Sequence, residues 1–170
     1  MHFYRILRET LQNYEKRFAN APRFVPNLLR FREYPYSYHG IYDEDRLIGT
    51  FILHPYSEVK GHETFKILRV ERPLLETGLS NRKRSEAFKG MKDYISDLGS
   101  KSCNVVEMEL YERIDDEIFF PSSLAVVGTF NLAQDFNLLV DWSFETIHST
   151  LCFELTREDE PRQSTKGRSE

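Results

Sequence analysis

Apolar residues at the start of the chain recur at the spacing of a helix. In residues 3–18 the large apolar side chains stand mostly three and four positions apart with charged residues between them, which predicts an amphipathic helix. The segment 20–26 contains two prolines that interrupt this pattern. A short second helix is predicted over residues 27–31.

The spacing of apolar residues then changes to the two-residue period of strands. Residues 36–43 and 47–54 are rich in Tyr, Ile, Leu, Phe and Thr, and the polar turn between them completes the pattern of a β-hairpin. A third strand is predicted over residues 64–71. Pro73 is expected to end it, because proline lacks the N–H that a strand ladder needs.

The strongest helical pattern covers residues 82–98. Its apolar stripe consists of Ala87, Phe88, Met91, Tyr94, Ile95 and Leu98. Ser80 or Asn81 can cap the first turn, and Gly99 can end the helix in the left-handed conformation. We expect this helix to pack on a sheet through Phe88, Met91 and Ile95.

The pattern after this helix predicts mostly strands. Residues 103–111 alternate between apolar and acidic side chains and read as a strand, whereas the acidic segment 112–122 is predicted to be a loop. Residues 124–142 fit a helical stripe, but residues 124–130 alone also fit a strand. Residues 143–155 favour one or two further strands.

The order of these elements predicts a single domain of the α+β class over residues 1–155. Its sheet is expected to be mixed and mainly antiparallel, with helices flanking it. Residues 156–170 contain no large apolar side chain and are predicted to form a disordered tail or linker.

Composition and charge exclude several classes of function. Of the residues, 40% are hydrophobic and 29% are charged, as in ordinary globular proteins. The apolar runs are too short to span a membrane, and the N-terminal helix lacks the apolar segment of a signal peptide, so a cytoplasmic protein is expected. The net charge of −4 does not favour nucleic acid. Cys103 and Cys152 are expected to be reduced, buried thiols.

Three stretches, in this order, resemble the GNAT superfamily of N-acyltransferases. They are IYDEDRLIGTFILHP, RKRSEAFKGMKDYISDLGSKSCNVVEMEL and FNLAQDFNLLVDWSFETIHSTLCFEL. The resemblance covers roughly residues 1–155, although the family's initial strand is missing from the predicted elements. It implies a twisted sheet, an acyl-CoA or acetyl-CoA donor bound where two central strands part, and an amine acceptor.

The chain departs from the family pattern at two places that matter for chemistry. The glycines of the family's phosphate loop, which let backbone N–H groups approach the phosphates, fall on Arg82 and Arg84. The family's tyrosine acid falls near Leu139, and the glycine of its "GF" motif is Ser143. Both the phosphate loop and the usual proton donor are therefore replaced.

Arg82, Lys83 and Arg84 form the most informative cluster. Cations at a helix N-terminus oppose the helix dipole, and a bound anion would offset this. The resemblance implies that the three side chains replace the glycine loop, and that the backbone of Leu68 to Val70 pairs with the pantetheine arm of the donor. The alternative is that Glu76, Glu86 and water neutralise the cluster.

Two carboxylates are candidate proton acceptors for the amine. Glu71 ends the predicted third strand, and Glu107 lies on the strand after the long helix. The alternative for Glu71 is an exposed charge beside Arg69 and Arg72.

The histidines and tyrosines carry weaker signals. His39, His54 and His148 could act as bases, but they lie on different predicted strands, and no spacing typical of a metal site occurs. Tyr36, Tyr38 and Tyr42 alternate along one strand and favour packing over binding. Cys103 has no neighbouring helper for nucleophilic chemistry.

Three functions remain open from the sequence. The first is transfer of an acyl group from a CoA-type thioester to an amine. The second is a non-catalytic binding or regulatory module that keeps the same scaffold, with a protein partner or a homodimer. The third is an N-acyl synthase that takes its acyl group from an acyl-carrier protein.

Overall fold

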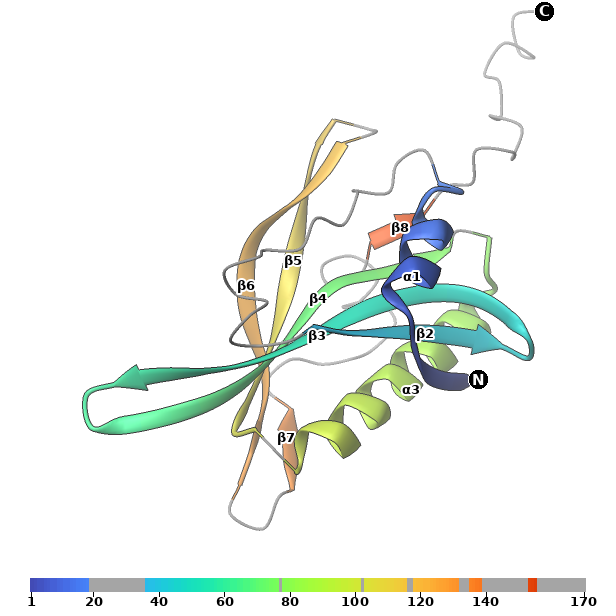
Figure 1. The fold of residues 1–170 in the computed structure, drawn as a ribbon. Coiled ribbons are helices and arrows are strands. Elements are labelled where there is room, and N and C mark those ends of the chain that lie inside the picture. The colour runs from blue at the N-terminus through green and yellow to red at the C-terminus, as the bar shows by residue number, and fades with distance from the viewer. Residues whose placement is uncertain are drawn as a thin grey trace, which may run out of the picture.

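The chain folds as a mixed sheet with a helix on either face (Figure 1). This computed structural model describes residues 1–18, 36–76, 78–101, 103–115, 118–131, 135–138 and 153–155. The elements in chain order are β1 (His2–Ile6), α1 (Arg8–Glu15), β2 (Ser37–Asp43), β3 (Arg46–Lys60), β4 (Glu63–Glu76), α3 (Asn81–Gly99), β5 (Val105–Asp115), β6 (Ile118–Phe130), β7 (Phe136–Leu138) and β8 (Phe153–Leu155).

Within the described residues the sheet has eight strands, and seven of them follow one another in space in their chain order, from β1 to β7. Five pairings are antiparallel, and two, β4 with β5 and β4 with β8, are parallel. The predicted α+β class with a mixed, mainly antiparallel sheet therefore describes the structure. No helix in the described ranges is long and apolar enough to cross a membrane.

The predicted helix over residues 3–18 is wrong at both ends, because α1 covers only Arg8–Glu15. Residues 2–6 form β1, which pairs antiparallel with β2, and the helix α1 begins only at Arg8. Phe3 explains the difference, because its ring packs 5.6 Å from the ring of Tyr94 on α3 and fills the space that Gly90 leaves open. A strand anchored to distant elements thus replaces a helix that local spacing alone favoured, and the chain has a strand before its first helix.

The predicted hairpin is confirmed as β2 and β3, but β4 does not end at Pro73. The β3–β4 ladder pairs Ile52 with Glu71 and Thr50 with Leu74, so the two residues between, Arg72 and Pro73, form a bulge. Proline is tolerated there because a bulge interrupts the ladder that would need its N–H. The strand continues beyond the bulge to Glu76.

The predicted long helix is confirmed as α3, although one of its expected caps differs. The Ser80 side chain accepts a hydrogen bond from the Lys83 N–H at 3.2 Å and caps the start. Gly99 is the last helical residue and does not have a positive φ; the C-cap is Ser100 in the right-handed conformation. Gly99 matters for packing instead, because a Cβ there would lie 2.9 Å from the ring of Phe130.

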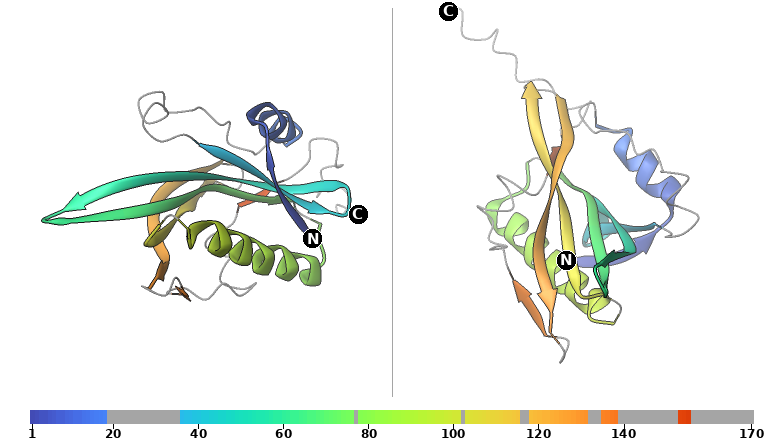
Figure 2. Two further views of the ribbon diagram at one scale, coloured as in Figure 1. Left: turned by 60° about the horizontal axis from the view of Figure 1, so that its bottom comes forward. Right: turned by 90° about the vertical axis from the view of Figure 1, so that its left-hand side faces the viewer.

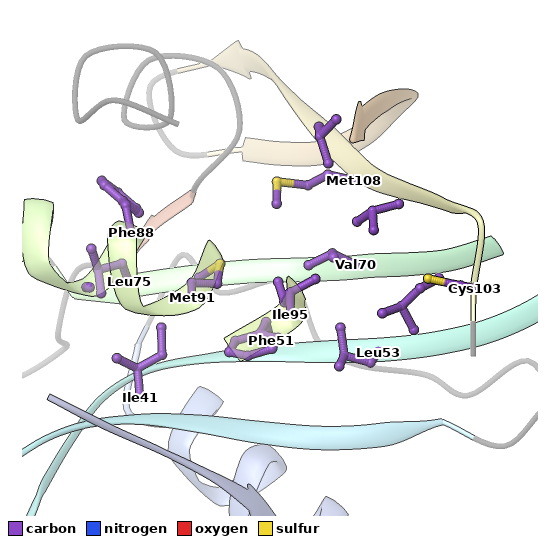
Figure 3. Packing of buried hydrophobic residues seen from close by; sticks show 14 of the residues in the cluster. Ile41, Phe51, Leu53, Val70, Leu75, Phe88, Met91, Ile95, Cys103 and Met108 are labelled. Atoms are coloured by element: carbon purple, nitrogen blue, oxygen red, sulfur yellow. The ribbon is translucent and has the colours of Figure 1, made fainter. Parts of the chain in front are cut away.

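The main core lies between α3 and the sheet. Figure 3 shows Phe88, Met91 and Ile95 of α3 facing side chains of β3, β4 and β5. Residues of the predicted helical stripe are buried, except that Tyr94 is partly buried and Leu98 is 36% exposed. A smaller cluster of Leu11, Tyr36, Tyr38 and Ile52 lies on the opposite face, under α1. Figure 2 shows the two helices on opposite sides of the sheet.

The predicted loop over residues 112–122 is wrong, because β5 and β6 form one long antiparallel hairpin through this region. Its ladder carries three register irregularities, one of them beside the pair Tyr111 and Pro121. Residues 124–130 belong to strand β6, so of the two alternatives for this segment, helix or strand, the strand is confirmed. β7 and β8 are short strands of three residues each. The predicted second helix at 27–31, most of 143–155 and the tail 156–170 lie outside the described residues.

We expect Met91→Asp to lower the free energy of unfolding by about 3–5 kcal/mol, because Met91 is 1% exposed and the new carboxylate would be buried without a partner. Urea denaturation followed by far-UV circular dichroism measures this loss. The control is Ser85→Asp at an exposed position of the same helix, which is expected to change stability by only about 0.5 kcal/mol. Equal effects of the two changes would contradict the packing of α3 on the sheet.

Candidate functional site

The face of the sheet opposite α3 carries a row of polar side chains across its three central strands. The ladder sets His54 of β3 opposite Arg69 of β4, and Arg69 opposite Glu107 of β5. Side chains alternate between the faces of a strand, so the neighbours of these residues, such as Val70 and Val106, point into the α3 core instead. We call His54, Tyr56, Arg69, Glu71 and Glu107 the polar network.

Arg69 is the centre of the polar network. Its guanidinium donates a hydrogen bond to the Tyr56 hydroxyl at 3.0 Å and lies 4.8 Å from the centre of the Tyr56 ring. It also forms ion pairs with Glu71, at 3.9 Å, and with Glu107, at 3.5 Å. Burial disfavours the charge, but Tyr56 and the two carboxylates outweigh it and raise the pKa of Arg69.

Tyr56 links this cation to Glu107. Its hydroxyl donates to the Glu107 carboxylate at 2.6 Å while it accepts from Arg69. Burial, together with the hydrogen bond to Glu107, raises the pKa of Tyr56, so the phenol keeps its proton at neutral pH. The Glu107 carboxylate is thereby held by a hydrogen bond from Tyr56 and an ion pair with Arg69.

His54 holds the other carboxylate of the polar network. It is fully buried, and its Nδ1 lies 3.3 Å from Oε1 of Glu71. A carboxylate can only accept this hydrogen bond, so Nδ1 carries the proton. The ring of Tyr36 covers the imidazole at 4.4 Å between centroids. Glu71 is therefore an oriented proton acceptor backed by a histidine, which is a geometry suited to general-base chemistry.

A second group of charges lies at the bulge of β4, just beyond the end of its ladder with β5. Arg72 has a φ of 52°, which is unusual for a residue with a side chain. Its backbone N–H donates to the Glu109 carboxylate of β5 at 2.9 Å, and its guanidinium binds the buried Glu15 of α1. Two carboxylates thus hold the bulge in a strained conformation.

The structure brings together the two predicted catalytic carboxylates. Glu71 and Glu107 lie on neighbouring strands of one face and share Arg69 as a cation. Glu71 is not an exposed strand-end charge, because its side chain is only 11% exposed. The ladder with β5 ends at Val70, so Glu71 is the first residue of β4 beyond that pairing.

Leu68 and Val70 occupy a different position from the one the resemblance implies. Both lie in the stretch of β4 that pairs with β3 on one side and with β5 on the other, and both side chains belong to the α3 core. An extended ligand has no strand edge to pair with there. β5 does not pair with β4 beyond Val70, so the edge of β4 that β5 does not cover begins at Glu71.

The predicted basic cluster at the start of α3 has partners of its own. The side chain of Arg82 is 88% exposed and pairs with Glu86 at 3.1 Å, while Lys83 binds Asp43 and lowers the pKa of that carboxyl. Arg84 is partly buried. Glu86 thus acts as the sequence suggested, whereas Glu76 is buried and binds Arg46 and Tyr14 instead.

Two other candidate side chains have structural roles. His39 is buried between Ser37 and Tyr94 and makes a 2.8 Å hydrogen bond to each hydroxyl; burial, aided by Arg5, lowers its pKa to about 4. Cys103 is buried, and this raises the pKa of its thiol to about 11, so it is no nucleophile at neutral pH. His148, Leu139, Ser143 and Cys152 lie outside the described residues.

The predicted packing role of the tyrosines agrees with the structure for two of them. Tyr36 and Tyr38 belong to the small cluster under α1. Tyr42 does not belong to it: its side chain is only partly buried, and its ring lies 5.5 Å from the ring of Tyr4. Within the described part of the chain, no three His, Cys, Asp or Glu side chains are arranged to hold a metal ion.

Sequence reasoning missed that His54, Tyr56 and Arg69 belong to the same site as Glu71. A signal for this was present, because His54 and Tyr56, Arg69 and Glu71, and Glu107 and Glu109 each stand two positions apart with an apolar residue or proline between them. Three strands with polar pairs at this spacing put those pairs on shared faces. The register that aligns them was not available from the sequence.

We expect Arg69→Met to lower the free energy of unfolding by about 3 kcal/mol. Two carboxylates, Glu71 and Glu107, are 11% and 15% exposed and would lose their shared cation. The matched control is Arg82→Met, whose side chain is 88% exposed, and this change should alter stability by only about 0.5 kcal/mol. Urea denaturation at pH 7 distinguishes the two. A loss in the control as large as that in Arg69→Met would contradict a buried network.

His39 should make stability depend on pH in a defined window. Its pKa is about 4 in the folded protein and about 6.5 when exposed, so the unfolded chain binds its proton first as pH falls. Stability from this residue is present above about pH 6.5 and is lost towards pH 4, by up to about 3 kcal/mol. His39→Gln should lose this part of the slope in urea titrations between pH 7 and pH 4.5. The exposed His62→Gln should keep the slope of the unmodified protein, and an unchanged slope in His39→Gln would refute the assignment.

Comparison of the sequence with protein-family models and with curated proteins finds no match. The case for a function therefore depends on the geometry of the residues themselves. That geometry consists of an oriented carboxylate, Glu71, at the point where two parallel strands part, with the rest of the polar network beside it.

Proposed function

We propose that this chain is an N-acyltransferase that moves an acyl group from a CoA-type thioester to an amine, with Glu71 as the proton acceptor. The observation that carries the proposal is the position of Glu71. It lies at the first residue of β4 beyond the ladder with β5, and it is hydrogen-bonded to a buried histidine.

The edge of β4 beside Glu71 offers a place for the thioester. The Arg72 N–H points toward β5 and there meets an oxygen acceptor, the Glu109 carboxylate. A thioester carbonyl in that place would accept the same hydrogen bond and would lie next to Glu71. Such a donor also stabilises the negative charge that develops on the carbonyl oxygen during attack.

The charges on this face favour an amine as the acceptor. Among the described residues, three carboxylates, Glu15, Glu71 and Glu107, pair with two guanidinium groups, those of Arg69 and Arg72. A fourth carboxylate, Glu109, accepts a hydrogen bond from the Arg72 backbone N–H. The excess of negative charge attracts an ammonium group. In the reaction Glu71 takes one proton from the ammonium, and the neutral amine nitrogen attacks the thioester carbon. The carbon–sulfur bond then breaks, and the sulfur leaves as a thiol with the proton that the nitrogen loses as the amide forms.

The cationic start of α3 fits the anionic end of such a donor. Asn81, the first residue of α3, follows Glu76, the last residue of β4, after only four intervening residues. Arg82, Lys83 and Arg84 would contact the phosphates through side chains, since the glycines that open the backbone are absent and the Lys83 N–H is taken by Ser80. Such contacts are exposed and therefore sensitive to salt.

The second candidate function is a non-catalytic binding or regulatory module on the same scaffold. It is favoured by the partners that the basic cluster already has, since Arg82 pairs with Glu86 and Lys83 with Asp43. A donor would have to compete with both pairs. On this reading the polar network stabilises the sheet and has no chemical role.

Calorimetric titration with acetyl-CoA and with longer acyl-CoAs tests the donor site. We expect weak binding that falls steeply between low and physiological salt, and that is lost in the triple variant Arg82→Ala, Lys83→Ala, Arg84→Ala. The control removes the same charge from three exposed lysines elsewhere: Lys60, Lys66 and Lys101. Tight, salt-independent binding that survives the triple change would contradict the side-chain contacts. No binding at millimolar concentration would favour the module or a carrier-protein donor.

For the chemical step, Glu71→Gln should lower the rate of amine-dependent thiol release by about 10²–10⁴-fold while the affinity for the acyl-CoA stays unchanged. The measurement is thiol release from the acyl-CoA in the presence of a panel of primary amines. An equal rate in Glu71→Gln would exclude this residue as the base.

A further inference from the structure

One edge of β4 is shared by two different strands. β5 pairs in parallel with residues 67–70, and β8 pairs in parallel with Leu74 to Glu76, while β3 occupies the opposite edge of β4. Figure 1 shows β8 beside the far end of β4, where β5 has already turned away. β8 therefore takes up the part of the edge that β5 leaves.

β8 pairs with fewer residues of β4 than either of its other two partner strands does. β8 is three residues long and forms three residue pairs with β4, whereas β3 forms eleven residue pairs with β4. Short edge strands with few backbone hydrogen bonds open at low free energy, independently of global unfolding. β8 also demonstrates that this edge accepts an extended segment, which is the principle of strand addition.

The proposed donor needs this same edge. Its thioester would lie at Glu71 and the Arg72 N–H, and its phosphates at the start of α3, beyond Glu76. An extended arm that joins these two points must run along Leu74 to Glu76, a stretch of about 10 Å at roughly 3.3 Å per residue. A pantetheine arm carries two amide groups and can form the same kind of backbone hydrogen bonds as a strand.

We infer that β8 occupies the place of the donor arm and is displaced when an acyl thioester binds. The inference rests on the proposed function, because it concerns the regulation of that same site. β8 and the Glu109 carboxylate then hold a closed state of the edge, with β8 on Leu74 to Glu76 and Glu109 on the Arg72 N–H. The apparent affinity for the donor is lowered by the fraction of molecules in the closed state.

Amide hydrogen exchange on the full chain tests the displacement directly. With acetyl-CoA or a longer acyl-CoA bound, we expect residues 153–155 to exchange at least about fivefold faster than in the free protein, while Leu74 to Glu76 stay protected. Such opposite responses of two paired strands would identify the ligand as a replacement for β8. If calorimetry detects binding but residues 153–155 exchange at an unchanged or slower rate, the inference that the donor displaces β8 is wrong. The proposed donor site is not contradicted by that result.

A variant pair gives a second measurement. Glu154→Pro removes a backbone N–H in the middle of β8, whereas Glu154→Ala keeps it and removes the same side chain. The proline variant is expected to bind the acyl-CoA about tenfold more tightly than the unmodified chain, and the alanine variant about equally. Equal affinity in all three proteins would show that β8 does not compete with the donor, and would not contradict the donor site itself. Failure of all three to bind any acyl-CoA would overturn the donor site and the competition together. If Glu154→Pro does not fold, the exchange measurement decides.

Discussion

The parallel ladder between β4 and β5 is the constraint on which the rest of the structure depends. It joins two antiparallel halves, β1 to β4 and β5 to β7, into one sheet. Parallel neighbours cannot be joined by a tight turn, so the chain must cross over the sheet, and α3 is that crossover. The helix consequently packs over the junction, with Phe88, Met91 and Ile95 in the same cluster as Val70 and Val106.

The same ladder builds the polar face. With Val70 opposite Met108 on the core side, Arg69 must stand opposite Glu107 on the other side, and the β3 register adds His54 to the row. A slip of one residue would bring the charges into the apolar core, so burial under α3 fixes the geometry of the polar network on the far face. Hydrophobic packing thus positions the groups to which we assign chemistry.

The ladder also decides where a ligand can bind. Because it ends at Val70, and because Arg72 and Pro73 form a bulge, β4 turns away from β5 at Glu71. The left-handed conformation of Arg72 is held by carboxylates from two other elements, Glu15 of α1 and Glu109 of β5. Strained residues held by their surroundings are frequent at functional sites. A proton acceptor, a backbone donor and an excess of carboxylates meet at this position.

The sequence alone determined those features that arise from local spacing. The period of the stripe on α3, the alternation of β2 and β3, and the position of Glu71 and Glu107 on strands could all be predicted, because side-chain periodicity assigns residues to faces. Prediction from the sequence failed where distant partners override local preference. Phe3 lies in a strand because its ring packs against Tyr94 and Gly90. Strand β4 continues past Pro73 because a bulge there removes the need for a backbone N–H.

Only the tertiary structure decided which polar residues meet. No local pattern shows that His54 lies opposite Arg69, or that Arg69 lies between Glu71 and Glu107, because register depends on the core that each strand buries. The placement of β8 on β4 is of the same kind, since residues 153–155 and 74–76 are far apart in the chain. Local spacing decides on which face of a strand a side chain lies. The neighbours of that side chain come from other strands that are distant in the sequence, and the packing of the whole sheet selects which strands pair and in which register.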